Sequence, residues 1–221
     1  LILEGIVVGD IVVNGGNVIL DDSTVGSVTK GQDNQETTEV ILSNGSVITG
    51  ECQNGVNVVD ISTIDNVAKL QEAVDKLSKV ILDQDLTINT KIIVTKDVVI
   101  DGNSKKITYV GSDRAFDVTS GANGANVTFK NLTIQLGSGY AERGINYNTN
   151  GYLTIENVKI LDNPEVNAFT YAINLPGSSD DANVEIRNSI IKGNIALNVW
   201  GENVTVNAEE TEFYGLDYSE A

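Results

Sequence analysis

Apolar and polar residues alternate in short segments along most of this chain, and two kinds of segment recur every 24 to 29 residues. The first kind has apolar residues at its second and fourth positions, and the second kind follows it after a turn rich in Gly or Asn. Alternation with a period of two residues indicates β-strands. A unit this short cannot bury its own apolar face and is stable only when neighbours stack on it, so the repeat predicts a β-solenoid. The first kind comprises residues 115–118, 144–147, 172–175 and 196–199, and the second comprises residues 126–134, 152–160, 183–191 and 203–206.

An Asn interrupts the second kind of segment at one position between two apolar halves, as Asn131, Asn157 and Asn188. Asn tolerates the left-handed backbone conformation that a sharp bend requires. Its amide can also bond to its counterpart in the next coil, because it carries both a donor and an acceptor. We therefore expect these three residues to stack in one column at a corner of the solenoid.

The first kind of segment divides into an inner and an outer face, because side chains of a strand alternate between its two sides. The outer side chains would repeat along the axis at roughly 5 Å, and are therefore candidate contacts for an extended ligand. The expected inner residues are Phe116, Val118, Ile145, Tyr147, Ile173, Leu175, Leu197 and Val199. The expected outer residues form one column of Asp117, Asn146, Asn174 and Asn198, and a second of Thr119, Asn148, Pro176 and Trp200.

Two regions differ in the strength of this pattern. Residues 1–61 carry a weaker and shorter version of the repeat, with Asp22 and Asn44 at the corner position, and are interpreted as a small solenoid module. Residues 62–221 form the main repeat and begin with the three-four apolar spacing of an amphipathic helix, over residues 62–80. We expect Ser62 or Thr63 to cap this helix, and the helix to cover the open end of the main solenoid. The competing interpretation is one continuous solenoid with the helix looped out sideways.

The helix, the opening segment of residues 97–103 and the succession of residues 115–118 and 126–134 resemble the pectate lyase-like adhesive domains of Gram-positive bacterial surface proteins. The resemblance covers about residues 62 to 212. It implies an all-β fold, a right-handed parallel β-helix of the pectin lyase-like kind with one N-terminal capping α-helix. It also implies a protein that is secreted or attached to the cell wall or cell surface of a bacterium, where the solenoid serves in adhesion or as a rigid spacer.

Catalysis is not expected from the residues on the outer face. A lyase of this resemblance uses several carboxylates to hold calcium and an Arg as base, and calcium needs six to eight oxygen ligands. Only Asp117 is acidic in the first outer column, and Arg114 and Arg143 lie nearby without a cluster of carboxylates. The chain contains no His. We therefore expect no enzyme activity, no cofactor, and at most weak binding of Ca²⁺.

The outer Asn residues have two interpretations, ordinary polar cover of an exposed strand or hydrogen-bonding partners for a sugar polymer or peptide. An exposed Trp at the end of such a column is suited to stacking on a sugar, and Tyr140, Tyr152, Tyr214 and Tyr218 could join it. One alternative function is thus a carbohydrate-binding protein for plant cell-wall or host glycans. Another is a polysaccharide lyase or epimerase that takes its acidic residues from elsewhere in a parent chain. The predicted binding residues are Asp117, Asn146, Asn148, Asn174, Asn198 and Trp200.

Charge restricts the partners. The 221 residues include 31 Asp and Glu against 14 Lys and Arg, a net charge of −17, so binding to nucleic acid or to an anionic membrane is disfavoured. We expect a monomer whose partner is a polysaccharide, a surface glycan or a host surface protein. The single Cys52 excludes an internal disulfide and is expected to be buried in a strand. No apolar run is long enough to span a membrane, and the start within strand-like residues 1–8 suggests a piece of a longer protein.

Overall fold

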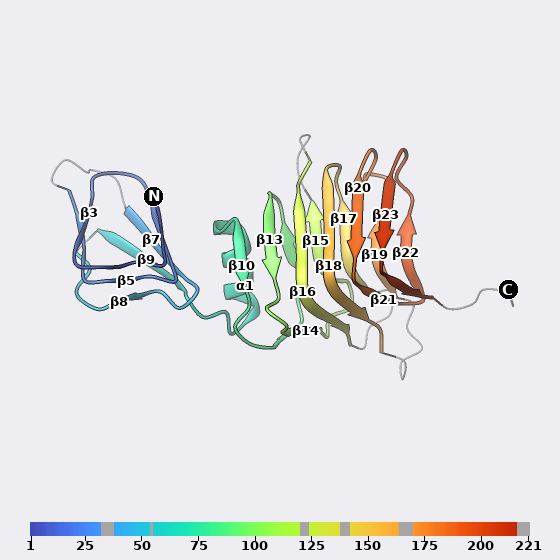
Figure 1. Cartoon of the computed structure of the whole chain (residues 1–221), viewed down its shortest axis with the longest axis horizontal. Coiled ribbons are helices and arrows are strands. Elements are labelled where there is room, and N and C mark those ends of the chain that lie inside the picture. The colour runs from blue at the N-terminus through green and yellow to red at the C-terminus, as the bar shows by residue number, and fades with distance from the viewer. Residues whose placement is uncertain (32–37, 54, 120–123, 138–141, 164–169, 216–221) are drawn as a thin grey trace, which may run out of the picture. The chain divides into compact units, whose positions relative to one another are not determined.

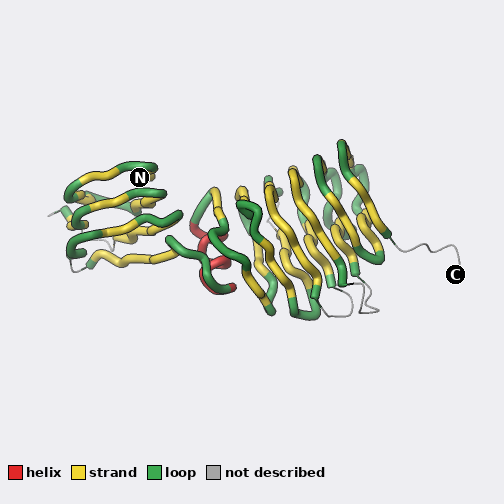
Figure 2. The backbone as a smooth tube through the Cα atoms, turned by 60° about the horizontal axis from the view of Figure 1, so that its bottom comes forward, coloured by secondary structure: helices red, strands yellow, loops and turns green. Residues whose placement is uncertain are grey.

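The computed structural model describes residues 1–31, 38–53, 55–119, 124–137, 142–163 and 170–215. Contacts divide the chain into an N-terminal unit, Leu1–Ile64, and a C-terminal unit, Asp65–Ala221. Both units consist of short parallel strands stacked in successive layers, which is compatible with a β-helix (Figures 1 and 2).

The N-terminal unit contains three parallel sheets within its described residues, with strand orders β1-β4-β7-β9, β2-β5-β8 and β3-β6. Its core is made of Val and Leu side chains such as Val18, Leu20 and Val40, which follow the expected period of two. Asp22 and Asn44 have the left-handed φ angles of 47° and 49° that their corner positions predict. The strands are β1 (Ile2–Glu4), β2 (Val7–Val8), β3 (Ile11–Val13), β4 (Val18–Asp21), β5 (Thr24–Val25), β6 (Val28–Lys30), β7 (Thr38–Ser43), β8 (Val47–Ile48) and β9 (Val56–Ile61).

Cys52 corrects one expectation about this unit. It is exposed and forms an isolated parallel bridge with Val28, rather than filling a place in the core. The bridge pairs backbone with backbone, and Cys52 is not among the residues of the apolar cluster that contains Val28.

The C-terminal unit begins with one helix, α1 (Val67–Lys76), and continues in strands only. One path of parallel strands runs β10-β13-β16-β18-β20-β23, joined by β11, β14, β21 and β24, and a second sheet runs β12-β15-β17-β19-β22. The first strands are β10 (Lys79–Ile81), β11 (Leu86–Ile88), β12 (Ile92–Val94), β13 (Val98–Asp101), β14 (Lys106–Tyr109), β15 (Arg114–Thr119) and β16 (Val127–Leu136). The later strands are β17 (Arg143–Asn148), β18 (Tyr152–Leu161), β19 (Tyr171–Leu175), β20 (Asn183–Arg187), β21 (Ile190–Lys192), β22 (Ile195–Val199), β23 (Thr205–Glu209) and β24 (Glu212–Tyr214).

The register confirms the predicted repeat. Phe116 pairs with Ile145, Ile145 with Ile173, and Ile173 with Leu197, so equivalent residues of successive coils lie directly beside one another. The expected inner residues of the first three of these strands are fully buried. The last strand differs, because Val199 is 41% exposed. Val199 belongs to the last coil. The inner face of this coil borders an apolar hollow of about 610 Å³, whose lining includes Leu197, Val206 and Phe213.

The corner Asn column is present as predicted. Asn131, Asn157 and Asn188 have φ angles of 50°, 53° and 49°, and the strands on either side of them are paired in register. The Nδ2 of Asn157 donates to Oδ1 of Asn131 at 2.9 Å, and the Nδ2 of Asn131 donates to Oδ1 of Asp101 at 3.1 Å. The amides of Asn131 and Asn157 therefore serve both the bend of their own coil and the contact with the preceding coil.

Helix α1 packs against β10, β11 and β12, the first strands of the C-terminal unit, and so has the expected position of a cap (Figure 1). It buries Leu70, Ala73 and Val74. Its N-cap is Asn66, whose side chain accepts from the backbone of Lys69 at 3.0 Å, and not Ser62 or Thr63 as expected. In the part of the chain that the structure describes, no helix has the length and apolarity needed to cross a membrane.

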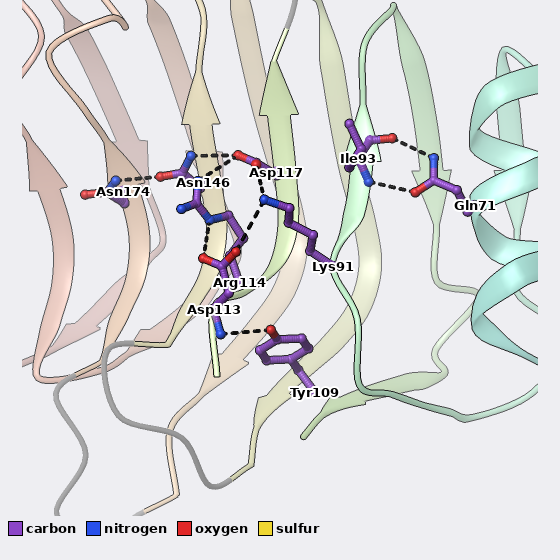
Figure 3. Close-up of polar contacts among 9 residues, drawn as sticks. All are labelled: Gln71, Lys91, Ile93, Tyr109, Asp113, Arg114, Asp117, Asn146 and Asn174. Carbon is purple, nitrogen blue, oxygen red and sulfur yellow. Dashed lines mark hydrogen bonds and ion pairs between the residues drawn. The ribbon is translucent and has the colours of Figure 1, made fainter. Parts of the chain in front are cut away.

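Gln71 on α1 completes the free edge of β12 (Figure 3). Its Oε1 accepts from the backbone N–H of Ile93 at 2.8 Å, and its Nε2 donates to the carbonyl of the same residue at 2.9 Å. One side-chain amide thus replaces the peptide group of a missing neighbouring strand. An open sheet edge is a template for pairing with other chains, and this contact blocks it.

Replacing Asn157 tests the corner. Asn157→Ala should reduce the free energy of unfolding by about 1–3 kcal/mol, because it forces Ala into a left-handed conformation and removes the bond to Asn131. Asn157→Gly should cost less, because Gly adopts this conformation freely and only the amide contact is lost. Chemical denaturation measures both, with Thr154→Ala as a control on the same strand. Equal stability of the Ala and Gly variants would contradict the proposed backbone strain.

Replacing Gln71 tests the cap. Gln71→Ala should lower the free energy of unfolding by about 1–2 kcal/mol, because two hydrogen bonds of about 1 kcal/mol each are lost. Hydrogen exchange should show faster exchange at the amide of Ile93, while Glu72→Ala on the same helix should leave that amide protected. Unchanged protection of Ile93 in the Gln71 variant would show that the helix covers the edge without its glutamine.

Candidate functional site

The predicted outer column lies on the sheet β12-β15-β17-β19-β22, one residue from each strand. The register places Ile93 beside Asp117, Asp117 beside Asn146, Asn146 beside Asn174, and Asn174 beside Asn198. The column therefore begins at the strand that α1 caps and ends at β22, in the last coil of this sheet.

The polar side chains of this column form a continuous hydrogen-bonded ladder, of which Figure 3 shows Asp117, Asn146 and Asn174. The Nδ2 of Asn146 donates to Oδ1 of Asp117 at 2.8 Å, and the Nδ2 of Asn174 donates to Oδ1 of Asn146 at 2.6 Å. The Nδ2 of Asn198 donates in turn to Oδ1 of Asn174 at 2.6 Å, and the indole Nε1 of Trp200 donates to Oδ1 of Asn198 at 2.8 Å. In each of these bonds the donor is the residue later in the chain, so every bond runs towards Asp117. The first acceptor of the ladder is therefore a carboxylate, which accepts hydrogen bonds more strongly than an amide.

Two cations close the ladder at its Asp117 end (Figure 3). Lys91 Nζ lies 3.1 Å from Oδ2 of Asp117 and 3.3 Å from Oδ2 of Asp113. The guanidinium of Arg114 lies 2.7 Å from Oδ1 of Asp113 through Nε and 3.1 Å from Oδ1 of Asp117 through Nη1. The backbone N–H of Asp113 donates to the hydroxyl of the buried Tyr109 at 3.0 Å, which holds this segment on the core.

The charges in this cluster stabilise one another. Burial by itself would raise the pKa of Asp117, but hydrogen bonds from Asn146, Lys91 and Arg114 outweigh burial and hold the pKa of the carboxyl below its ordinary value. Burial opposes ionisation of Asp113 too, and Arg114 and Lys91 likewise lower its pKa. The hydrogen bond to Asp117 is the main cause that raises the pKa of Lys91.

The exposure of the first outer column differs from the expectation. Asp117, Asn146 and Asn174 are only 8%, 3% and 6% exposed, although they point away from the apolar core. Each amide lies between those of the neighbouring coils, and their polar atoms are hydrogen-bonded to one another. Asn198 is partly exposed in the last coil. Most of the column is therefore a structural ladder, and its role in binding a ligand stays a prediction.

The second outer column remains more accessible. Asn148 is in register with Thr119, is partly exposed, and accepts a hydrogen bond from Ser178 through its Oδ1. Trp200 is 74% exposed and is the most exposed of the predicted binding residues, while Asn148 and Asn198 are partly exposed. Tyr152 and Tyr214 are exposed on other strands, and Tyr140 and Tyr218 lie outside the described residues.

Lys91 and Asp113 were not identified from the sequence as neighbours of Asp117. Residues 92–94 pair with residues 116–118, which places Lys91 beside Ala115, one residue from Arg114. Aligning residues 92–94 on the repeat would have shown that a second cationic side chain, Lys91, joins Arg114 beside Asp117. Arg143 was correctly placed in register with Arg114, but it lies over the ring of Tyr171, 5.3 Å from its centroid.

The carboxylates and the guanidinium of this cluster are poorly placed to bind a metal cation or to accept a proton from a substrate. Both oxygens of Asp117 and both oxygens of Asp113 already accept from Lys91, Arg114 or Asn146. Burial by itself would lower the pKa of Arg114, but the two carboxylates outweigh it and raise that pKa, which opposes use of this guanidinium as a base. Over the residues that the structure describes, no group of three or more His, Cys, Asp and Glu gathers as metal ligands would.

Comparisons with protein-family models, with curated proteins and with solved structures each give no match to this chain. The resemblance to pectate lyase-like domains therefore rests on the residues of the repeat and on the stacked parallel strands.

The ion pairs of Asp117 predict a specific response to acid. A carboxyl whose pKa is lowered in the folded state adds stability above its ordinary pKa of 3.8, and this stability is lost as the pH falls through the lowered value. The free energy of unfolding should therefore fall below about pH 4. Asp117→Asn should be less stable at pH 7 and show a shallower decline in acid, measured by denaturation at each pH. Asp83→Asn, at an exposed carboxylate, is the control, and equal acid profiles of wild type and Asp117→Asn would contradict this role.

Proposed function

We propose that the chain is a non-catalytic module of a secreted or surface-attached bacterial protein, with the fold of a right-handed parallel β-helix of the pectate lyase-like kind. The module acts in adhesion or as a stiff spacer and contacts a polysaccharide or surface glycan through the face that ends at Trp200. A host surface protein is the other partner class that this face would suit.

The fold assignment is supported by the corner column and the cap together. Asn131, Asn157 and Asn188 share one left-handed position between two paired strands, and α1 covers the first coil. Both features belong to the resemblance drawn from the sequence. A stack of coils held by hydrogen bonds from each layer to the next resists bending, which suits a spacer.

The observation that carries the non-catalytic proposal is the closed polar ladder. In a lyase, the carboxylates of this face would be free to hold calcium and an Arg would be free to take a proton. Here Asp117 and Asp113 are neutralised by Lys91 and Arg114, and the remaining column is Asn. Opening these contacts for a substrate would leave the buried carboxylate of Asp117 unpaired, which is costly.

The polysaccharide proposal rests on Trp200. Its indole is 74% exposed, while its Nε1 is fixed by Asn198, so the ring is both accessible and held in orientation. A fixed aromatic surface loses little conformational entropy when a sugar stacks on it. Asn198 and Asn148 lie on the same outer face and are partly exposed, so they could add hydrogen bonds beside the stacked ring.

Fluorescence tests this contact directly, because Trp200 is the only Trp of the chain. Titration with neutral plant cell-wall polysaccharides and host-type glycans should change its emission in a saturable way for a ligand of this face. Trp200→Ala should abolish retention on the same immobilised polysaccharide, while Tyr152→Ala, which removes an exposed aromatic residue from β18, should retain it. Retention that survives Trp200→Ala would place the binding site elsewhere. No response to any glycan would leave the spacer role alone.

An assay on polygalacturonate tests the lyase alternative. We expect no unsaturated product absorbing in the ultraviolet, with or without calcium and over a wide pH range, because Asp117 and Arg114 are held in ion pairs. Product that forms in the wild type and disappears in Asp117→Asn would overturn the non-catalytic proposal.

A further inference from the structure

A second polar surface lies beside the Asn corner, away from the Trp200 ladder. A hollow of about 220 Å³ is lined there by Ser104, Asn131, Leu132, Thr133, Asn157 and Lys159. Ser104 lies in the turn before β14, and the other lining residues belong to β16 and β18; β14, β16 and β18 are consecutive neighbours in their sheet.

Two lysines flank one threonine in this surface. The register places Lys106 beside Thr133, and Thr133 beside Lys159, with all three on the outer side of their strands. Neighbouring strands are about 4.8 Å apart, so the two lysine Cα atoms lie about 10 Å apart with the threonine between them. An anion above Thr133 would therefore be within reach of both ammonium groups.

Several polar groups of this surface make no contact within the described part of the protein. Among the described residues, no carboxylate lies within ion-pair distance of the ammonium groups of Lys159 and Lys106, and no hydrogen bond involves the hydroxyls of Ser104 and Thr133. Asp85 is bound to the backbone N–H of Lys106 at 2.8 Å, which makes Lys159 the stronger of the two cations for a ligand. The surface thus presents an excess of donors, on a protein whose net charge is −17.

One acceptor complements these donors. Asn157 lines the hollow and donates its Nδ2 to Asn131, while its Oδ1 has no hydrogen-bond partner among the described residues. The hollow equals about seven waters at about 30 Å³ each, which is more than an isolated ion fills. Its chemistry suits a group that carries both an oxyanion and a hydroxyl.

We propose that this hollow binds an acidic sugar residue. The oxyanion, a carboxylate or a sulfate, lies over Thr133 between Lys106 and Lys159 and accepts hydrogen bonds from Thr133 and Ser104. A sugar hydroxyl donates to Oδ1 of Asn157. The site is separate from Trp200 and does not depend on the function proposed for that face.

Titrations followed by ¹H–¹⁵N NMR test this site. Glucuronate or a sulfated monosaccharide, added at low salt, should shift the amide signals of Ser104, Thr133 and Lys159 in a saturable way, with a Kd on the order of 1 mM. Glucose should have no effect. Raising the salt to about 0.2 M should weaken binding, because the charges are at the surface. The two acidic sugars separate a carboxylate ligand from a sulfate ligand.

Variants identify the residues. Lys159→Gln should weaken binding about tenfold, and Lys159→Arg should retain most of it. Lys79→Gln, which removes one exposed positive charge from β10, should leave the Kd unchanged. Unchanged signals elsewhere in the spectrum establish that each variant is folded.

Three results would overturn the proposal. The first is a linear response without saturation, and the second is equal binding by Lys159→Gln and wild type. The third is inorganic sulfate binding as tightly as the sulfated sugar, since the sugar would then contribute nothing.

Discussion

The structure depends on the register that stacks equivalent residues of successive coils directly beside one another. With strands about 4.8 Å apart, each side chain meets its counterpart in the next coil before it meets anything else. Apolar side chains can stack on one another in any number of successive coils, and these columns form the core. Among polar side chains, Asn is suited to it, because one amide both donates and accepts. Two carboxylates placed in succession would repel one another.

This constraint explains the composition of the ladder on the sheet β12-β15-β17-β19-β22. Asp117 stands once, in the β15 position, where Lys91 and Arg114 provide charge, and the later coils carry Asn146, Asn174 and Asn198. The aligned donors let each bond polarise the next. The same rule operates at the corner, where Asp101 accepts from Asn131 and Asn131 accepts from Asn157. A carboxylate begins each ladder and amides continue it.

Satisfied ladders also decide which surfaces remain available to a partner. The side-chain amides of Asn146 and Asn174 are hydrogen-bonded within the column. The face expected to bind a polymer therefore presents mainly the exposed Trp200 and the partly exposed Asn198 and Asn148. Around Lys159 the column changes from residue to residue, and a side chain without a like neighbour keeps its hydrogen-bonding capacity. Polar groups that do not repeat are thus better candidates for recognition in this fold than those that do.

The sequence by itself determined the repeat, the strands, the corner positions of Asn131, Asn157 and Asn188, and the capping helix, because period-two alternation and left-handed Asn are local properties. It also separated inner from outer residues, and failed at Val199, which lies in the last coil. Only the tertiary structure decided that the outer Asn column is buried, that Lys91 and Asp113 join Asp117, and that Gln71 closes the edge at Ile93. Those contacts join residues of different coils or elements, and alternation along one strand says nothing about what lies beside it.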